Sequence, residues 1–189
     1  LYKNGYRGPI YTTDATRDLC AIMLEDSAHI QEQEAEWKNR KAMRSGAEMV
    51  EPDYTVEDAE KVMQQFVPCP YETWQNLFDG PTGKIEMRFT DVGHLLGSAS
   101  ISLRVTEPGK QPEIIVFSGD IGNTHQPLIK DPANPGHADY LIMESTYGDR
   151  SHGPKPDYLG ELTDVLQSTF DKGGNVVIPS FAVGRTQEL

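Results

Sequence analysis

Two residues of metal-binding type each follow a predicted strand. His94 lies in the segment GHLLGS, and Asp120 lies in the segment FSGDIG. Imidazole nitrogen and carboxylate oxygen are ligands that zinc takes in proteins. Glycines in both segments permit sharp turns and close backbone approach, which a metal and a phosphate-sized substrate would both need. Either segment alone is also typical of an ordinary turn, and the two together indicate a metal site.

Three predicted strands would carry these residues to one edge of a sheet. Residues 85–90 alternate apolar and polar side chains, which indicates a half-buried strand before His94. Residues 114–117 are a short apolar run typical of a buried strand, and Asp120 comes shortly after it. A third apolar run, residues 140–143, leads directly into Glu144. We therefore expect His94, Asp120 and Glu144 at the same sheet edge.

A helical arm precedes this strand-rich body. Thr13 or Asp14 can cap a first helix, and a second, polar helix is expected over about 28–44. Thr55 opens a third helix with a capping box, and apolar residues at helical spacing continue it toward Pro68.

The remaining elements alternate strand and helix. Residues 101–106 should form a strand that pairs with residues 114–117. Residues 158–170 have a helical apolar face and are followed by two glycines, then by a predicted strand at 175–178. This alternation indicates the α/β class.

Composition limits the function classes. A net charge of −12 argues against a simple nucleic-acid binder, because such binding requires Lys and Arg to neutralise phosphates. Much of the acidity lies in the helical arm, where a solvated helix surface explains it. No apolar run is long enough to cross a membrane. Cys20 and Cys69 have no metal-site or disulfide spacing, so we expect free thiols, a reducing compartment and a cytoplasmic protein.

The ordered set of motifs resembles the metallo-β-lactamase-fold nucleases of the β-CASP group, which include the pre-mRNA 3′-end endonuclease and ribonuclease J. The set comprises GHLLGS, FSGDIG, ESTYG from Glu144 and PSFAVGRTQE from Pro179, and residues 12–19 and 26–31 resemble the family's helical insert. The resemblance implies a partial metallo-β-lactamase domain, an αββα sandwich, over residues 1–150 with the insert at 13–67. Residues 151–189 would begin the β-CASP domain.

The same resemblance implies a function and residue roles. It implies a phosphodiesterase that cleaves single-stranded RNA, as an endonuclease or a 5′-exonuclease, with two zinc ions that activate water and stabilise phosphate charge. His94 matches the histidine that completes one zinc's ligands, and Asp120 matches the carboxylate shared by both ions. Glu144 matches the acidic motif that opens the β-CASP region, and we assign it to supporting a ligand or to proton transfer.

Part of the family pattern is absent from the sequence. The His-x-His-x-Asp-His cluster is not present, and the segment from Leu1 resembles the one that follows it in the family. We therefore expect a piece of a longer enzyme that is inactive alone and self-associates through strand edges or apolar helix faces. His125 could approach phosphate, but a solvated surface histidine is the expected reading, as for His29, His137 and His152. Arg185 fits a phosphate contact or a structural ion pair equally well.

Two alternatives to the nuclease stay open. One is a non-catalytic RNA-processing scaffold of the same family, which the retention of His94 and Asp120 disfavours. The other is a metallo-β-lactamase-fold hydrolase or redox protein acting on thioesters, lactams or through a di-iron centre. The ESTYG and PSFAVGRTQE segments argue against that one, because they resemble only β-CASP proteins.

Overall fold

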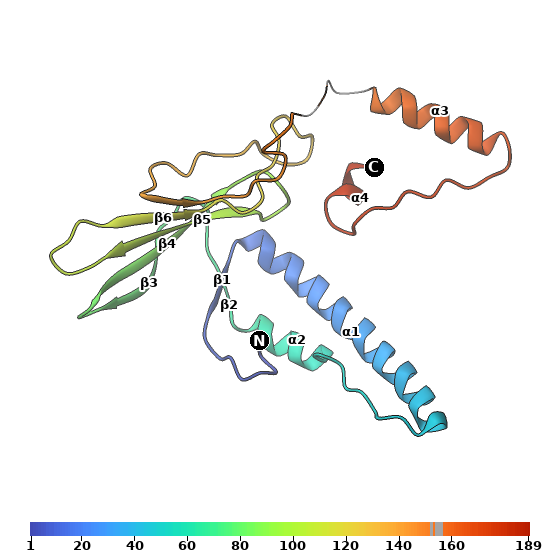
Figure 1. Ribbon diagram of the computed structural model, residues 1–189, viewed down its shortest axis with the longest axis horizontal. Helices are drawn as coiled ribbons and strands as arrows, with labels where there is room; N and C mark the ends of the chain where they lie inside the picture. Colours follow the sequence, from blue (N-terminus) through green and yellow to red (C-terminus); the bar gives the residue numbers. More distant parts are fainter. Residues whose placement is uncertain (152, 154–156) are drawn as a thin grey trace. The chain divides into compact units, whose positions relative to one another are not determined.

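The computed structural model describes residues 1–151, 153 and 157–189, so the expectation for His152 lies outside the described residues. The chain forms two compact units, residues 1–143 and residues 144–189, and each is described by itself (Figure 1). Helices combine with a mixed β-sheet, which confirms the α/β class. No helix within the described ranges has the length and apolar character that crossing a membrane requires.

One long helix, rather than two, begins the first unit. Helix α1 (Asp14–Ser45) starts at Thr13, whose hydroxyl accepts the Thr16 N–H, and ends at Gly46 with a φ of 71°. The prediction of a break before residue 28 was wrong. Asp26 and Ser27 have the side chains of helix caps, but residues 14–45 contain neither glycine nor proline to interrupt the helix.

Helix α1 buries a stripe of small side chains spaced seven residues apart, Ala28, Ala35 and Ala42. Helix α2 (Val56–Met63) packs against α1 and buries Ala59. Asn39 fastens the segment between the two helices, because its amide donates to the Val50 carbonyl (2.9 Å) and accepts the Val50 N–H (2.7 Å). Helices α1 and α2 thus form a helical hairpin, which is held by packing at the buried alanines and by the hydrogen bonds of Asn39.

Helix α2 begins as predicted and ends early. The Thr55–Asp58 capping box is present. However, residues Phe66–Pro68 form strand β2, which pairs in parallel with strand β1 (Ile10–Thr12), so the predicted continuation of the helix to Pro68 was wrong. Strand β1 lies more than fifty residues before β2 in the sequence, so the spacing of apolar residues near Phe66 does not reveal this pairing.

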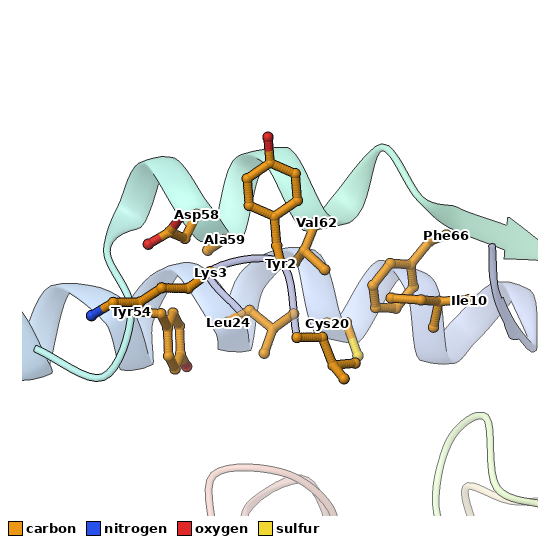
Figure 2. A pocket seen from close by; sticks show the side chains of 11 residues that line it. Tyr2, Lys3, Ile10, Cys20, Leu24, Tyr54, Asp58, Ala59, Val62 and Phe66 are labelled. Atoms are coloured by element: carbon orange, nitrogen blue, oxygen red, sulfur yellow. The ribbon is translucent and has the colours of Figure 1, made fainter. Parts of the chain in front are cut away.

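An apolar cavity of about 290 Å³ lies between the two helices and the β1–β2 pair (Figure 2). Leu24 and Cys20 of α1 line one side and Val62 of α2 another. Burial raises the pKa of the Cys20 thiol, which disfavours the reactive thiolate. Cys69 is buried and also free, and burial raises its pKa as well.

The main sheet has five strands in the order β3-β4-β5-β6-β7. Strands β3 (Gln75–Gly80), β4 (Gly83–Asp91), β5 (Ala99–Thr106) and β6 (Glu113–Phe117) are antiparallel neighbours. Strand β7 (Tyr140–Ile142) runs parallel to β6 at the edge. The strands predicted at 85–90, 101–106 and 114–117 are therefore confirmed, as is the pairing of the last two.

The two faces of the sheet differ in chemistry. Met87 and Phe89 pack with Cys69 into a hydrophobic cluster on one face. Residues that alternate with them are polar but equally buried, namely Thr90, Ser100 and Ser102. The expectation of a buried strand at 140–143 was wrong in one respect: β7 forms, yet Tyr140, Leu141 and Ile142 are each more than half exposed, because an edge strand has a neighbour on one side only.

The described residues of the second unit form two helices, α3 (Tyr158–Phe170) and α4 (Arg185–Glu188). Helix α3 matches its predicted bounds, with Asp157 accepting the Gly160 N–H at the start and Gly173 in the left-handed region after the end. The strand predicted at 175–178 is wrong, since these residues have no strand structure. A strand requires a partner for its backbone groups, and the described residues of this unit supply none.

Candidate metal site

The loop after β4 holds His94 by hydrogen bonds from both of its ends. The Asp91 carboxylate accepts the Gly93 N–H at 2.9 Å, as the strand turns. The Ser98 hydroxyl oxygen accepts the N–H groups of His94 and Leu95, each at 3.1 Å. The backbone of the histidine is therefore fixed while its ring stays free to bind.

The start of helix α1 supports the same loop. The hydroxyls of Thr13 and Thr16 lie 2.9 and 3.0 Å from the Gly97 carbonyl oxygen and donate to it. Gly97 has a φ of 85°, and a β-carbon there would meet the Thr16 hydroxyl at 2.5 Å. Tyr71 donates to the Ser98 carbonyl at 2.9 Å. Thr13 is thus both a helix cap and a support for the His94 loop.

The loop after β6 carries Asp120 and lies against the His94 loop. The Ser118 N–H donates to Ile142 of β7 (2.9 Å), and the Gly122 N–H donates to Val92 (2.8 Å). These bonds continue the sheet's pairing past the strand ends, and they bring the two candidate ligands into one place.

His94 Nε2 and Asp120 Oδ2 are 3.9 Å apart. The side chains are 42% and 75% exposed, so both donor atoms can reach a bound ion from solvent. Two ligands of a tetrahedral zinc with bonds of about 2.1 Å stand about 3.4 Å apart, a separation that a small side-chain rotation would produce here. The donor pair therefore fits zinc. Within the described residues, no three His, Cys, Asp or Glu side chains gather into a metal-binding group.

Glu144 is not part of this pair. It is half-buried and begins the second unit, two residues after the end of β7. The structure thus brings His94 and Asp120 together within the first unit.

The other histidines and Arg185 have local partners. His125 adopts a left-handed φ of 61°; its N–H donates to Asp131 (2.6 Å) and its ring lies 3.7 Å from the same carboxylate. The His137 ring lies 3.2 Å from Asp139. Arg185 forms an ion pair with Glu188 at 2.9 Å. His29 lies on the exposed surface of α1, where its ring is 2.9 Å from the Gln33 amide.

The residues that position the site were not predicted. Thr13 was predicted only as a possible helix cap, Thr16 was noted only within the segment 12–19, and Gly122 was noted only as one of several turn glycines. The one available signal was the repeated threonine in TTDAT, residues 12–16. A helix cap needs a single hydroxyl, so the additional threonines could have indicated a further contact.

Known proteins match this chain over its whole length. No family model matches it. Over 189 residues the chain is 35% identical to ribonuclease TTHA0252 of Thermus thermophilus, and it covers 37% of that protein. It is 33% identical to the transcription termination factor FttA of Methanocaldococcus jannaschii, of which it covers 27%. The FttA of Pyrococcus horikoshii is 30% identical over 98% of the chain, with 26% of that protein covered.

These relatives are β-CASP nucleases of the metallo-β-lactamase fold, and the chain matches a part of each. The resemblance stated from the four motifs and from residues 12–19 and 26–31 is thereby confirmed, and the match includes the residues that form α1 and α2. The chain spans between about a quarter and somewhat over a third of the length of the curated relatives it matches.

Proposed function

We propose that the full-length protein is a zinc-dependent phosphodiesterase that cleaves single-stranded RNA, as an endonuclease or a 5′-exonuclease. The observation that carries this proposal is the 3.9 Å approach of His94 to Asp120 at the ends of two neighbouring loops. The names of the relatives, a ribonuclease and a transcription termination factor, support RNA as the substrate.

We further propose the domain assignment that accompanies this function. Residues 1–150 would belong to an αββα metallo-β-lactamase domain, with the α1–α2 hairpin as its helical insert at 13–67, and residues 151–189 would begin the β-CASP domain. The division of the chain after Met143 supports a boundary in this region. Two free cysteines support a reducing, cytoplasmic setting.

Each residue's part follows from its placement. His94 would ligate through Nε2, the atom that faces Asp120, while Ser98 holds its backbone. Asp120 would use both carboxylate oxygens, which lets one side chain serve two ions and offset part of their charge. Two bound zinc ions would lower the pKa of a water and stabilise charge on the phosphate. Glu144 would support a ligand or accept a proton. The 189-residue chain alone would be inactive, because catalytic zinc requires three or more protein ligands.

Three single variants of the full-length protein test this assignment. Asp120→Ala should abolish cleavage of labelled single-stranded RNA and remove bound zinc, and His94→Ala should come close to the same result. His125→Ala is the matched control, since this exposed histidine pairs with Asp131 and contacts neither candidate ligand. Zinc content and cleavage rate are measured for each. An Asp120→Ala protein that stays active with a full complement of zinc would refute the site, and RNA binding without any cleavage by the parent protein would favour the scaffold.

A further inference from the structure

The distal part of α1 is basic, in a chain whose net charge is −12. Residues 37–44, WKNRKAMR, contain two lysines and two arginines and no acidic residue. The segments on both sides are acidic: residues 14–36 carry Arg17 as their single Lys or Arg among several carboxylates, and residues 45–60 carry none. Positive charge is therefore concentrated at one place on the helix.

Four of these residues share one helix face. Trp37, Arg40, Lys41 and Arg44 follow the spacing i, i+3, i+4 and i+7, which places them along one side of α1. At about 100° per residue, this side lies opposite the stripe that contains Ala42 and packs toward α2. We call these four residues the distal basic face.

The distal basic face is exposed to solvent, and its three cationic side chains have no carboxylate partner among the described residues. The Trp37 side chain is 52% exposed, and Lys41 Nζ lies 3.5 Å from the centre of its ring. Neighbouring Lys38 differs, because it pairs with Glu34 at 3.5 Å. Among the residues that the structure describes, Arg40, Lys41 and Arg44 form no ion pair with a carboxylate.

Helix stability alone does not explain this arrangement. A cation in the last turn interacts favourably with the helix dipole, which accounts for Arg44. That effect fades within one turn, and it does not require an exposed tryptophan two turns before Arg44. A tryptophan beside unpaired cations is the combination that binds single-stranded nucleic acid, where cations meet phosphates and the ring stacks on a base.

We propose that the distal basic face is a second contact for single-stranded RNA, away from the His94–Asp120 site. This rests on the proposed RNA function. Twenty-four residues separate Thr13, beside the His94 loop, from Trp37. The helix rise of about 1.5 Å per residue puts them about 36 Å apart. A stacked strand of about 3.4 Å per nucleotide would need about ten nucleotides to reach from one to the other. The contact therefore selects RNA by length.

The test uses the full-length protein carrying Asp120→Ala, so that RNA binding is measured without cleavage. The triple variant Arg40→Gln, Lys41→Gln, Arg44→Gln removes the charges and keeps good helix formers. For an RNA of about 20 nucleotides, we expect at least about tenfold weaker binding and a salt-dependence slope lower by about 2, from about 0.7 per lost phosphate contact. Binding of an RNA of about five nucleotides, too short to span the distance, should not change. Lys38→Gln, in the same helix but already paired, is the control and should bind normally.

The ring is tested separately. Trp37→Leu should weaken binding of the longer RNA, and Trp37→Phe should restore most of it, while binding of polyglutamate should be insensitive to either change. Unaltered RNA affinity and salt slope in a triple variant of parental thermal stability would overturn the proposal. Weakened polyglutamate binding with unaltered RNA binding would overturn it in favour of an acidic protein partner. Both results leave the proposed function intact if the parent still cleaves RNA, whereas a parent that neither binds nor cleaves RNA refutes the function itself.

Discussion

Gly122 packs so closely against Gly93 that a β-carbon on Gly122 would lie 1.7 Å from the Gly93 carbonyl oxygen. The two glycines belong to the loops that carry Asp120 and His94. Their contact sets how closely the two candidate ligands approach, and no other residue type can occupy position 122 without moving one loop.

Gly122→Ala should therefore separate the loops. We expect a loss of about 1–3 kcal/mol in the free energy of unfolding, the usual cost of overpacking, together with weaker zinc binding by the full-length protein. Denaturant unfolding and zinc titration measure the two effects. Gly153→Ala is the control, because a β-carbon there meets nothing within 4 Å. A Gly122→Ala protein with parental stability and zinc affinity would show that the loops are not held by this contact.

Thr13→Ala should affect both the fold and the site. The loss of an N-cap costs about 1 kcal/mol, and the Gly97 carbonyl would keep only Thr16 as a hydroxyl donor. Thr55→Ala removes an equivalent cap from α2, with its partners confined to Asp58, and serves as the matched control. Both variants should lose similar stability, but Thr13→Ala alone should lower RNA cleavage by the full-length protein. Equal cleavage by the two variants would exclude a role for Thr13 beyond capping.

Stability should fall in acid. Hydrogen bonds, first from Lys84 and then from Arg104, lower the pKa of Glu86, and the Ile114 N–H lowers the pKa of Asp139. A carboxyl whose pKa is lower in the folded state stabilises the fold at pH above its unfolded pKa, about 4.3 for Glu and 3.9 for Asp, and loses that contribution as the pH falls. Urea midpoints should thus be flat above about pH 5 and decline below it. Glu86→Gln should make the decline shallower, and an unchanged slope would contradict this account.

The 189-residue chain should self-associate. Strand β7 is a sheet edge whose Leu141 and Ile142 side chains are 56% and 51% exposed, and such edges pair with other chains. Light scattering over a concentration series should show dimers or larger species. Leu141→Lys should reduce the association, because a charged edge resists pairing. Leu128→Lys, at an equally exposed leucine outside any strand, should not. A monomer throughout the series would contradict the prediction.

Local signals were sufficient for the elements whose causes are local. The cap at Thr13, the capping box at Thr55 and the glycines after α3 each act within a turn of the chain, so sequence located them correctly. Strand β4 was visible because one face is apolar. Sequence spacing predicted a helix at Phe66–Pro68, where strand β2 forms by pairing with the distant β1. Composition predicted a strand at 175–178, where none forms. Whether a strand forms depends on a pairing partner elsewhere in the chain, which local sequence does not reveal.

The site divides in the same way. Sequence placed His94 and Asp120 just past strand ends, because His94 follows a segment of alternating apolar and polar residues and Asp120 follows a short apolar run. Their mutual approach depends on Gly122 touching Gly93 and on the threonines of α1 reaching Gly97, contacts that join segments far apart in the chain. The periodicity of apolar residues along the sequence does not predict such contacts.

The order of the strands has a consequence for how the protein folds. Strands β3 to β6 pair with their immediate sequence neighbours, so each hairpin closes a short loop at little cost in chain entropy. The β1–β2 pair must instead join Ile10 to Phe66 across the whole helical hairpin. The meander should therefore form early and the β1–β2 pair late, so that substitutions in β4 and β5 slow folding while those in β1 and β2 mainly speed unfolding.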